Sequence, residues 1–257
     1  MTDAQKINAK MDEAIPQLRD FLSPFVASIS SREPHSTVAK HFGSGSFARM
    51  NETHFLLSNA HVLGRKDLTL GIVLKNNTEM HTLTGAVPQS EDADLAITEI
   101  PAEDWDQGDR RAVDAQLFNR PHDVPDGEIC FFMGFPGAHS FSSVAERTVR
   151  TRAFPYAGQK VPRLTDDWVF YVNVDFKTMR DEHGQSVEPF DFEGVSGSLV
   201  WNTRIVECVT NGIDWSQFVV TPAGVVRGWQ ESYGRLEIVR SEYIWDLFHR
   251  GISAAVS

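Results

Sequence analysis

The alternation of apolar and polar positions predicts a chain built mostly from short β-strands. Short apolar runs recur from residue 25 onward, separated by glycine, proline and polar residues. Strands with turn signals between them are typical of a barrel or sandwich. We expect strands at 25–31, 54–58, 68–74, 80–87, 95–100, 129–135, 147–154, 168–176, 198–209, 217–220 and 224–229.

Helical spacing occurs at the two ends of the chain. In the segment 3–22, apolar residues recur three or four positions apart, as on one face of a helix that Thr2 or Asp3 caps. Pro16 favours a kink or a division into two short helices. We expect this segment to pack on the body of the domain, or to act as a docking or regulatory arm for a protein partner. The segment 241–248 repeats the helical spacing with Ile244, Leu247 and Phe248.

A polar segment divides the strand-rich region into two halves. Residues 101–127 are rich in Asp, Pro, Gly and Arg and show little periodicity, so they are a plausible connector. We therefore predict three parts: a helical arm at 1–34, a first β-barrel at 35–122 and a second β-barrel with a C-terminal helix at 123–257. Within the first barrel, glycine and serine fill the four positions between Phe42 and Phe47, as a close approach between chain segments requires.

Composition narrows the class of protein. The 257 residues are 41% hydrophobic and 23% charged, which is ordinary for a globular protein. The net charge of −11 speaks against a nucleic-acid partner. Neither a secretory signal nor a run long enough to span a membrane is visible, so we expect a cytoplasmic protein without a membrane partner.

The chain has only two cysteines, Cys130 and Cys208. This scarcity fits a reducing compartment. Both lie in apolar runs, and we interpret them as buried free thiols, although the sequence leaves a pairing between them open. The nine histidines are scattered, and none forms a His-x-x-x-His pair beside an acid. We therefore expect no metal site and no cofactor, and interpret His41, His54 and His81 as polar residues on strands or turns.

Three local patterns carry the chemistry. The first is Leu57-Ser58-Asn59-Ala60-His61-Val62, in which a histidine follows an apolar strand. The second is Asp94-Leu95-Ala96-Ile97, where an acid opens an apolar run. The third is Gly194-Val195-Ser196-Gly197-Ser198-Leu199, a serine between glycines.

These residue types together can make a nucleophile. A serine hydroxyl needs a base within hydrogen-bond reach, and the base needs a third group that orients it. Histidine suits the base role, and a carboxylate holds its tautomer. The glycine before the serine lets the N–H groups of Gly194 and Ser196 turn toward a developing oxyanion. We therefore predict a triad of His61, Asp94 and Ser196, with Asp92 as a rival for the acid.

The order of the three patterns separates classes of hydrolase. Nucleophile-elbow enzymes have the order Ser, Asp, His, and subtilisin-like enzymes have Asp, His, Ser. This chain has His, Asp, Ser. The serine motif also fails Gly-x-Ser-x-Gly, because Ser198 occupies the last position.

With these motifs, residues 35–250 resemble the trypsin-like serine peptidases, which fold as two packed six-stranded β-barrels. The histidine and acid motifs are similar to those of the family. Gly194 to Ser198 resembles the serine motif of bacterial glutamyl-endopeptidase-like members. The turn Gly134-Phe135-Pro136-Gly137 resembles one that follows a second-barrel strand in bacterial members. The resemblance implies a mostly β fold with two six-stranded antiparallel barrels, a triad across the cleft between them, and endopeptidase activity on protein or peptide substrates.

The chain departs from the family in several places, among them Leu199, which replaces the usual proline. Val195 replaces the acid that pairs with a new N-terminus in animal trypsins, so we expect no activation by that ion pair. Residues 177–192 form a charged insertion before the serine motif. The segment Gly212-Ile213-Asp214-Trp215 resembles Gly-Ile-His-Trp in glutamyl endopeptidases, where the histidine lies in the primary specificity pocket and contacts an acidic side chain of the substrate. Asp214 in that place favours cleavage after Arg or Lys, while Phe190 in the insertion favours apolar residues; alternatively, Asp214 faces solvent or caps a turn.

Two other functions stay open from the sequence. One is a catalytically silent protease-fold module that binds peptides or partners. The other is a serine esterase or other acyl hydrolase on the same fold. Both are compatible with the three motifs, because a sequence does not report the distances between side chains.

Overall fold

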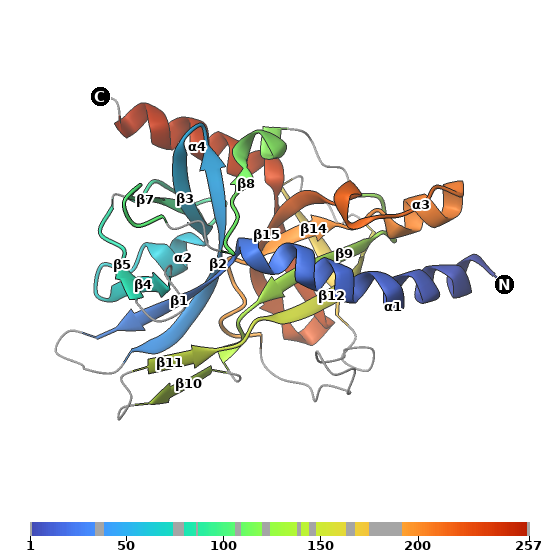
Figure 1. The fold of residues 1–257 in the computed structure, drawn as a ribbon, viewed down its shortest axis with the longest axis horizontal. Helices are drawn as coiled ribbons and strands as arrows, with labels where there is room; N and C mark the ends of the chain where they lie inside the picture. The colour runs from blue at the N-terminus through green and yellow to red at the C-terminus, as the bar shows by residue number, and fades with distance from the viewer. Residues whose placement is uncertain are drawn as a thin grey trace.

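The computed structural model describes residues 2–33, 39–73, 80–85, 87–105, 109–119, 124–137, 140–143, 148–162, 168–174 and 192–255. The fold is mostly β, as predicted, with one helix near each end and two β-halves between them (Figure 1). The predicted Phe190 and most of the charged insertion at 177–192 lie outside the described residues.

The first half is a sheet of eight strands. Its order is β5-β4-β1-β2-β3-β7-β6, and β8 pairs with β2. No pairing joins β5 to β6 in the described part of this sheet, so this half is an open sheet where the sequence predicted a six-stranded barrel. The strands are β1 (Val26–Arg32), β2 (Lys40–Met50), β3 (Thr53–Ser58), β4 (Thr69–Val73), β5 (Met80–Thr82), β6 (Gln89–Ser90), β7 (Leu95–Ile100) and β8 (Val113–Asp114).

The second half is the predicted closed barrel of six antiparallel strands. Its order is β12-β13-β16-β15-β14-β9, and a separate hairpin joins β10 (Ser140–Ser143) to β11 (Thr148–Thr151). The barrel strands are β9 (Ile129–Gly134), β12 (Phe154–Lys160), β13 (Val169–Asn173), β14 (Leu199–Asn202), β15 (Thr221–Gln230) and β16 (Arg235–Arg240).

Three apolar clusters form the core, and one of them joins the two halves. One lies inside the first sheet and one inside the barrel. The third spans both halves, because Leu57 and Ile97 of the first sheet share it with Phe131 and Val225 of the barrel. Burial of this shared cluster stabilises the contact between the halves and fixes their relative position.

The N-terminal segment forms one helix, α1 (Asp3–Leu22), that lies beside β9, β12 and α3 (Figure 1). Thr2 caps its start, and the side chain of Gln5 accepts in return from the N–H of Thr2. Pro16 lies inside one continuous helix, so the expected alternative of two short helices was wrong. Ala14, Leu18 and Leu22 are buried in the shared core, so tertiary packing supports the helix through the proline.

The C-terminal segment forms α4 (Ser241–Ala255), as its spacing predicted. Phe248 of α4 packs in the shared core against Phe55 and Phe118, with ring centroids 5.2 and 6.2 Å away. Phe118 belongs to the 3₁₀ helix η2 (Ala115–Asn119). Among the described helices, none combines the length and the apolar character needed to cross a bilayer.

The prediction of a single strand over 198–209 was wrong in its second half. The strand β14 ends at Asn202, and residues Ile205–Asn211 form the helix α3. The buried carboxylate of Glu128 accepts the N–H groups of Val206 and Glu207, at 2.9 and 3.0 Å, and so stabilises the start of this helix. The 217–220 strand was also wrong, since Gln217–Val219 forms the 3₁₀ helix η4.

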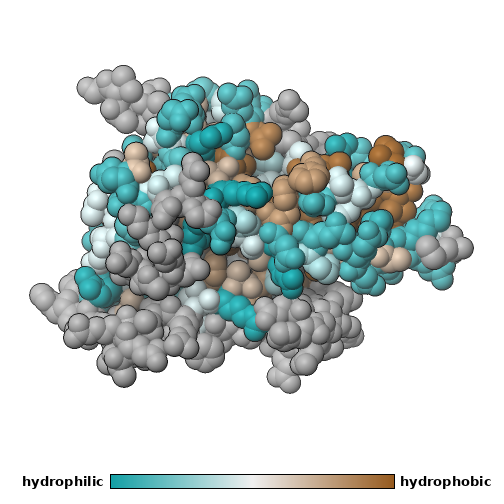
Figure 2. Space-filling model, in the orientation of Figure 1, coloured by the Kyte–Doolittle hydropathy of each residue, from teal (hydrophilic) through white to brown (hydrophobic). Residues whose placement is uncertain are grey.

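Apolar surface gathers over the region of α3 (Figure 2). Ile213 and Phe218, in the segment that follows α3, are 56% and 74% exposed. Phe218 also contacts Phe21 of α1 edge-to-face, at 5.4 Å between ring centroids. This segment therefore links the N-terminal helix to an exposed apolar surface.

Candidate active site

His61 and Asp94 are joined by two hydrogen bonds. Nδ1 of His61 lies 2.7 Å from Oδ2 of Asp94, and the main-chain N–H of His61 donates to Oδ1 at 3.0 Å. An ionised carboxylate only accepts hydrogen bonds, so Nδ1 carries the hydrogen and Nε2 is the basic nitrogen of the neutral ring. The Asp94 side chain is 17% exposed and that of His61 is 51% exposed. The acid is therefore shielded while the base can be reached from solvent.

Main-chain hydrogen bonds of Asp94 fix the position of the segment that carries His61. Asp94 adopts a left-handed conformation with φ of 50°, which aspartate tolerates better than most residues. Its carbonyl accepts the N–H of Ala60 at 3.1 Å and the side-chain amide of Asn59 at 2.8 Å. The short helix α2 (Ala60–Leu63), which carries His61, is thus fixed to the turn before β7. The rival acid, Asp92, is exposed and makes no contact with His61.

Residues 194–198, which carry Ser196 and are called the serine loop, contain two glycines with positive φ. Gly194 and Gly197 have φ of 89° and 91°, a region that side chains with a Cβ rarely adopt. Between them, the Val195 side chain is fully buried in the barrel core, and its N–H donates to the carbonyl of Phe192 at 3.0 Å. The Val195 carbonyl accepts from the hydroxyl of Ser198 at 2.7 Å. Valine thus anchors the loop by burial.

Ser44 of β2 connects this loop to the first sheet. Its hydroxyl donates to the carbonyl of Gly194 at 2.7 Å and accepts from the N–H of Phe135 at 2.9 Å. Its own N–H donates to the carbonyl of Ser196 at 3.1 Å. Ser44 belongs to the glycine–serine run that predicted a close approach, and the structure places that approach at the serine loop.

Gly197 brings the loop within contact of the histidine motif. A Cβ on Gly197 would lie 2.1 Å from Oγ of Ser58 and 2.2 Å from the carbonyl oxygen of Ser44. Ser58 precedes His61 by three residues, and its hydroxyl donates to the Ser44 carbonyl at 2.6 Å. The loop that carries Ser196 therefore meets the segment that leads into His61.

Two main-chain N–H groups of the serine loop have no acceptor in the described residues. In the described residues, the N–H groups of Gly194 and Ser196 donate to no protein acceptor, whereas those of Val195, Gly197 and Ser198 are all hydrogen-bonded. Main-chain donors left without a partner beside a serine hydroxyl suit a developing negative charge.

The Ser196 hydroxyl donates to the carbonyl of Arg227 on β15, at 3.4 Å, and is not hydrogen-bonded to His61 in this structure. The bond to Arg227 is long, and rotation about the Cα–Cβ bond re-aims a serine hydroxyl. Catalytic hydrogen bonds are often long or misaligned before substrate binds.

His41 of β2 lies beneath the serine loop. A Cβ on Gly194 would lie 2.7 Å from Nε2 of His41, and this nitrogen has no hydrogen-bond partner in the described part of the chain. Nδ1 lies 3.1 Å from the hydroxyl of Ser28. Burial lowers the pKa of His41, and the nearby carbonyls of Phe135 and Gly194 oppose this only in part. The sequence gave no sign of this contact, because its residues are far apart in the chain.

Asp214 was predicted either as a specificity residue or as a residue that faces solvent. It is exposed in the connection between α3 and η4, as the second alternative expects, and η4 packs against α1. The strand beside Ser196 is β15, through Arg227 and through the carbonyl of Val226, which accepts from the N–H of Gly197 at 2.9 Å. The helix α3 takes up the residues after β14.

Aromatic rings line the barrel next to the serine loop. Phe192 lies 4.7 Å from Trp229 of β15 and 5.3 Å from Tyr156 of β12, between ring centroids. Tyr156 stacks on Phe132 at 4.8 Å. These contacts join the start of the serine loop to the strand beside Ser196 through aromatic rings of the barrel core.

Two other site predictions concern cysteines and metals. Cys130 and Cys208 are buried free thiols, as predicted, although Cys208 lies in α3 and not in a strand. Burial raises the pKa of Cys130 to about 12, so this thiol stays protonated and is a poor nucleophile. Within the described residues, no group of three or more His, Cys, Asp or Glu side chains is placed to hold a metal ion.

Comparison with known proteins gives likeness in structure only. No protein-family model and no curated protein matches the sequence. One similar solved structure comes from work on the coupled folding and binding of the intrinsically disordered Sesbania mosaic virus VPg protein. It has a TM-score of 0.48 and 13% identity, over 86% of this chain and 87% of that chain.

A second similar structure is the catalytically active tobacco etch virus protease complexed with product. It has a TM-score of 0.46 and 10% identity, over 85% of this chain and 74% of that chain. The fold is defined by the strands themselves: a closed six-stranded antiparallel barrel packed on an open sheet, with a helix near each end.

Proposed function

We propose that this chain is a serine endopeptidase that cleaves peptide bonds through an acyl-enzyme on Ser196. The observation that carries the proposal is the paired contact of His61 with Asp94, which leaves Nε2 as a base at the junction where the serine loop meets the first sheet. Two unpaired N–H groups on that loop add the means to bind an oxyanion.

Each residue has one role in the proposed reaction. Oγ of Ser196 bonds to the scissile carbonyl carbon while its proton passes to Nε2 of His61. The N–H groups of Gly194 and Ser196 donate to the oxyanion. The C–N bond then breaks, and the amine leaves with the proton from His61. Water then bonds to the ester carbonyl carbon while its proton passes to Nε2. The bond from that carbon to Oγ breaks, Oγ takes the proton from His61, and the acid is released.

Asp94 is the orienting group in this scheme. It holds the tautomer in which Nδ1 donates, and it stabilises the imidazolium that forms when Nε2 takes the proton. Before the first step, the Ser196 hydroxyl must leave the Arg227 carbonyl and turn toward Nε2. The 3.4 Å length of the existing bond makes that rotation inexpensive.

A catalytically silent module that binds peptides or partners is the second candidate. The observation that favours it is the hydroxyl of Ser196, which points to Arg227 and not to His61. In that case the surroundings of Ser196 would bind a peptide without cleaving it. Specificity for Arg or Lys has lost its support, because Asp214 is exposed beside α3.

The two candidates differ in the reactivity of Ser196. We expect a fluorophosphonate to label the intact protein, with the adduct on Ser196 by peptide mass spectrometry. Labelling should disappear in Ser196→Ala and slow strongly in His61→Ala. It should be unchanged in Ser232→Ala, an exposed serine on η5 (Glu231–Tyr233). Absence of labelling in a folded protein would support the silent module.

Turnover then separates a peptidase from an esterase. A fluorescently labelled denatured protein should be cleaved, and Ser196→Ala should lower the rate by about a million-fold, as removal of a triad serine does elsewhere. A loss of less than about tenfold, in a sample cleared of contaminating protease, would remove Ser196 from this role. Turnover of esters alone would assign an acyl hydrolase.

A further inference from the structure

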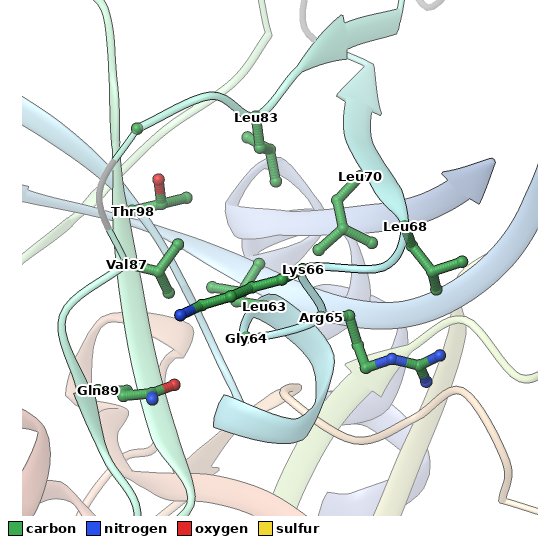
Figure 3. A pocket seen from close by; sticks show the side chains of 11 residues that line it. Leu63, Gly64, Arg65, Lys66, Leu68, Leu70, Leu83, Val87, Gln89 and Thr98 are labelled. Carbon is green, nitrogen blue, oxygen red and sulfur yellow. The ribbon is translucent and has the colours of Figure 1, made fainter. Parts of the chain in front are cut away.

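A cavity lies at the open seam of the first sheet. The strands β5 and β6 are the two ends of the sheet and are not paired with each other in the described chain. A cavity of about 450 Å³ fills this region (Figure 3). That volume is within the range of roughly 300–1,000 Å³ that is usual for small-molecule sites. It is lined by Leu63, Gly64, Arg65, Lys66, Leu68, Leu70, Leu83, Gly85, Val87, Gln89 and Thr98.

The lining is apolar on one side and polar on the other. Figure 3 shows Leu68, Leu70 and Leu83 together, and the ends of Lys66 and Gln89 on the opposite side, toward Val87. Thr98 lies beyond Val87 in this view, and its hydroxyl is buried, so a ligand in the cavity does not reach it.

The charge at the cavity is positive and uncompensated. Arg65 is occupied by Asp67, through two hydrogen bonds of 2.7 and 2.6 Å. Lys66 makes no ion pair or hydrogen bond with a described residue, and its side chain extends over the cavity in Figure 3. None of the described lining residues is acidic. An ammonium group above an apolar cavity complements an anion that carries a hydrocarbon chain.

We propose that this cavity binds an amphipathic carboxylate of medium chain length. The hydrocarbon chain lies among the leucines, and the carboxylate pairs with Lys66 on the side of Gln89. The cavity lies against α2, since Leu63 follows His61 by two residues and faces the first-sheet core. The inference does not depend on the peptidase reaction, because the cavity and its charge exist whether or not Ser196 is reactive.

The test is calorimetric titration of the full chain with sodium decanoate below its micelle concentration. We expect saturable one-to-one binding, and weaker binding of both decanol and decyltrimethylammonium. Lys66→Gln should weaken decanoate binding about fivefold, the size of an exposed ion pair. Lys40→Gln is the matched control, since Lys40 is an exposed lysine on β2 outside the cavity, and it should bind as the intact chain does.

A second variant tests the apolar side. Leu83→Trp fills the cavity from a half-buried position and should weaken binding at least about tenfold, the affinity of two buried methylene groups. Thermal unfolding of each variant checks that it folds; should Leu83→Trp not fold, Lys66→Gln and the three ligands decide. The proposal is overturned by an absence of saturable decanoate binding, by equal binding of decyltrimethylammonium, or by unchanged affinity in Lys66→Gln.

Discussion

Removal of one hydroxyl should both destabilise the fold and disable the site. Ser44 donates to the Gly194 carbonyl at 2.7 Å and accepts from the Phe135 N–H at 2.9 Å, and it is fully buried. Ser44→Ala keeps the shape of the position and removes both bonds. Two main-chain groups are then left without partners in the interior.

The size of the effect follows from these two groups. Each net hydrogen bond is worth about 1 kcal/mol, and each buried group left unpaired costs about 1–3 kcal/mol. For two such groups we therefore expect the free energy of unfolding to fall by about 2–6 kcal/mol, out of a total of about 5–15 kcal/mol for a typical domain. Because the Gly194 carbonyl is also released, we expect turnover to fall by about tenfold or more, short of the loss of a whole oxyanion donor.

The assay is urea unfolding followed by tryptophan fluorescence, with fluorophosphonate labelling as the readout of the site. Ser31→Ala is the control, because Ser31 is buried on β1 and its hydroxyl makes no hydrogen bond with a described residue. It should change stability by less than about 0.5 kcal/mol. The reasoning is refuted if Ser44→Ala and Ser31→Ala have the same stability. Lost stability with unchanged labelling would leave Ser44 a purely structural role.

Three further predictions test the surroundings of the site. Gly194→Ala should lower both stability and labelling, because its φ is 89° and its Cβ would lie 2.7 Å from Nε2 of His41; unfolding and labelling rates check this. In the folded chain, burial lowers the pKa of His41 below its ordinary value of 6.5, so below pH 6.5 the unfolded chain binds more protons than the folded chain. The free energy of unfolding should therefore fall as the pH is lowered through 6.5, and this fall should be shallower in His41→Gln. Deletion of residues 1–24 should lower the melting temperature by exposing the core that Leu18 and Leu22 cover, and unchanged activity and self-association in a folded truncation would make the helix merely structural.

The parts of the fold that were predicted correctly depend on local periodicity. The spacing of apolar residues in 3–22 is a property of that segment alone, and α1 has the bounds that it predicted. The strands β3, β7 and β9 likewise follow from short apolar runs with turn signals on each side. The pairing of His61 with Asp94 followed from chemistry, since the residue types limited what each could do.

The parts that failed depend on contacts distant in sequence. The run 198–209 is apolar enough for a strand, but the carboxylate of Glu128 holds two of its N–H groups and favours a helix. That contact spans nearly 80 residues, so no local pattern reports it. The same helix leads into the exposed segment that carries Asp214. The open seam between β5 and β6 is also a matter of pairing, which single strands do not specify.

The junction between the two halves shows why small residues without catalytic chemistry decide the geometry of the site. Ser44 and Ser58 of the first sheet meet Gly197 so closely that one added methyl group would lie 2.1 Å from the Ser58 hydroxyl. The loop could not approach β2 if position 197 carried a side chain, and Ser196 would then be held away from the segment that leads to His61. The hydroxyls of Ser44 and Ser58 occupy the remaining space and satisfy the main-chain groups that this approach buries. The proposed position of Ser196, across two separate sheets from His61, therefore requires a seam of glycine and serine, and the position of that seam in the sequence is as informative about the site as the three proposed catalytic residues.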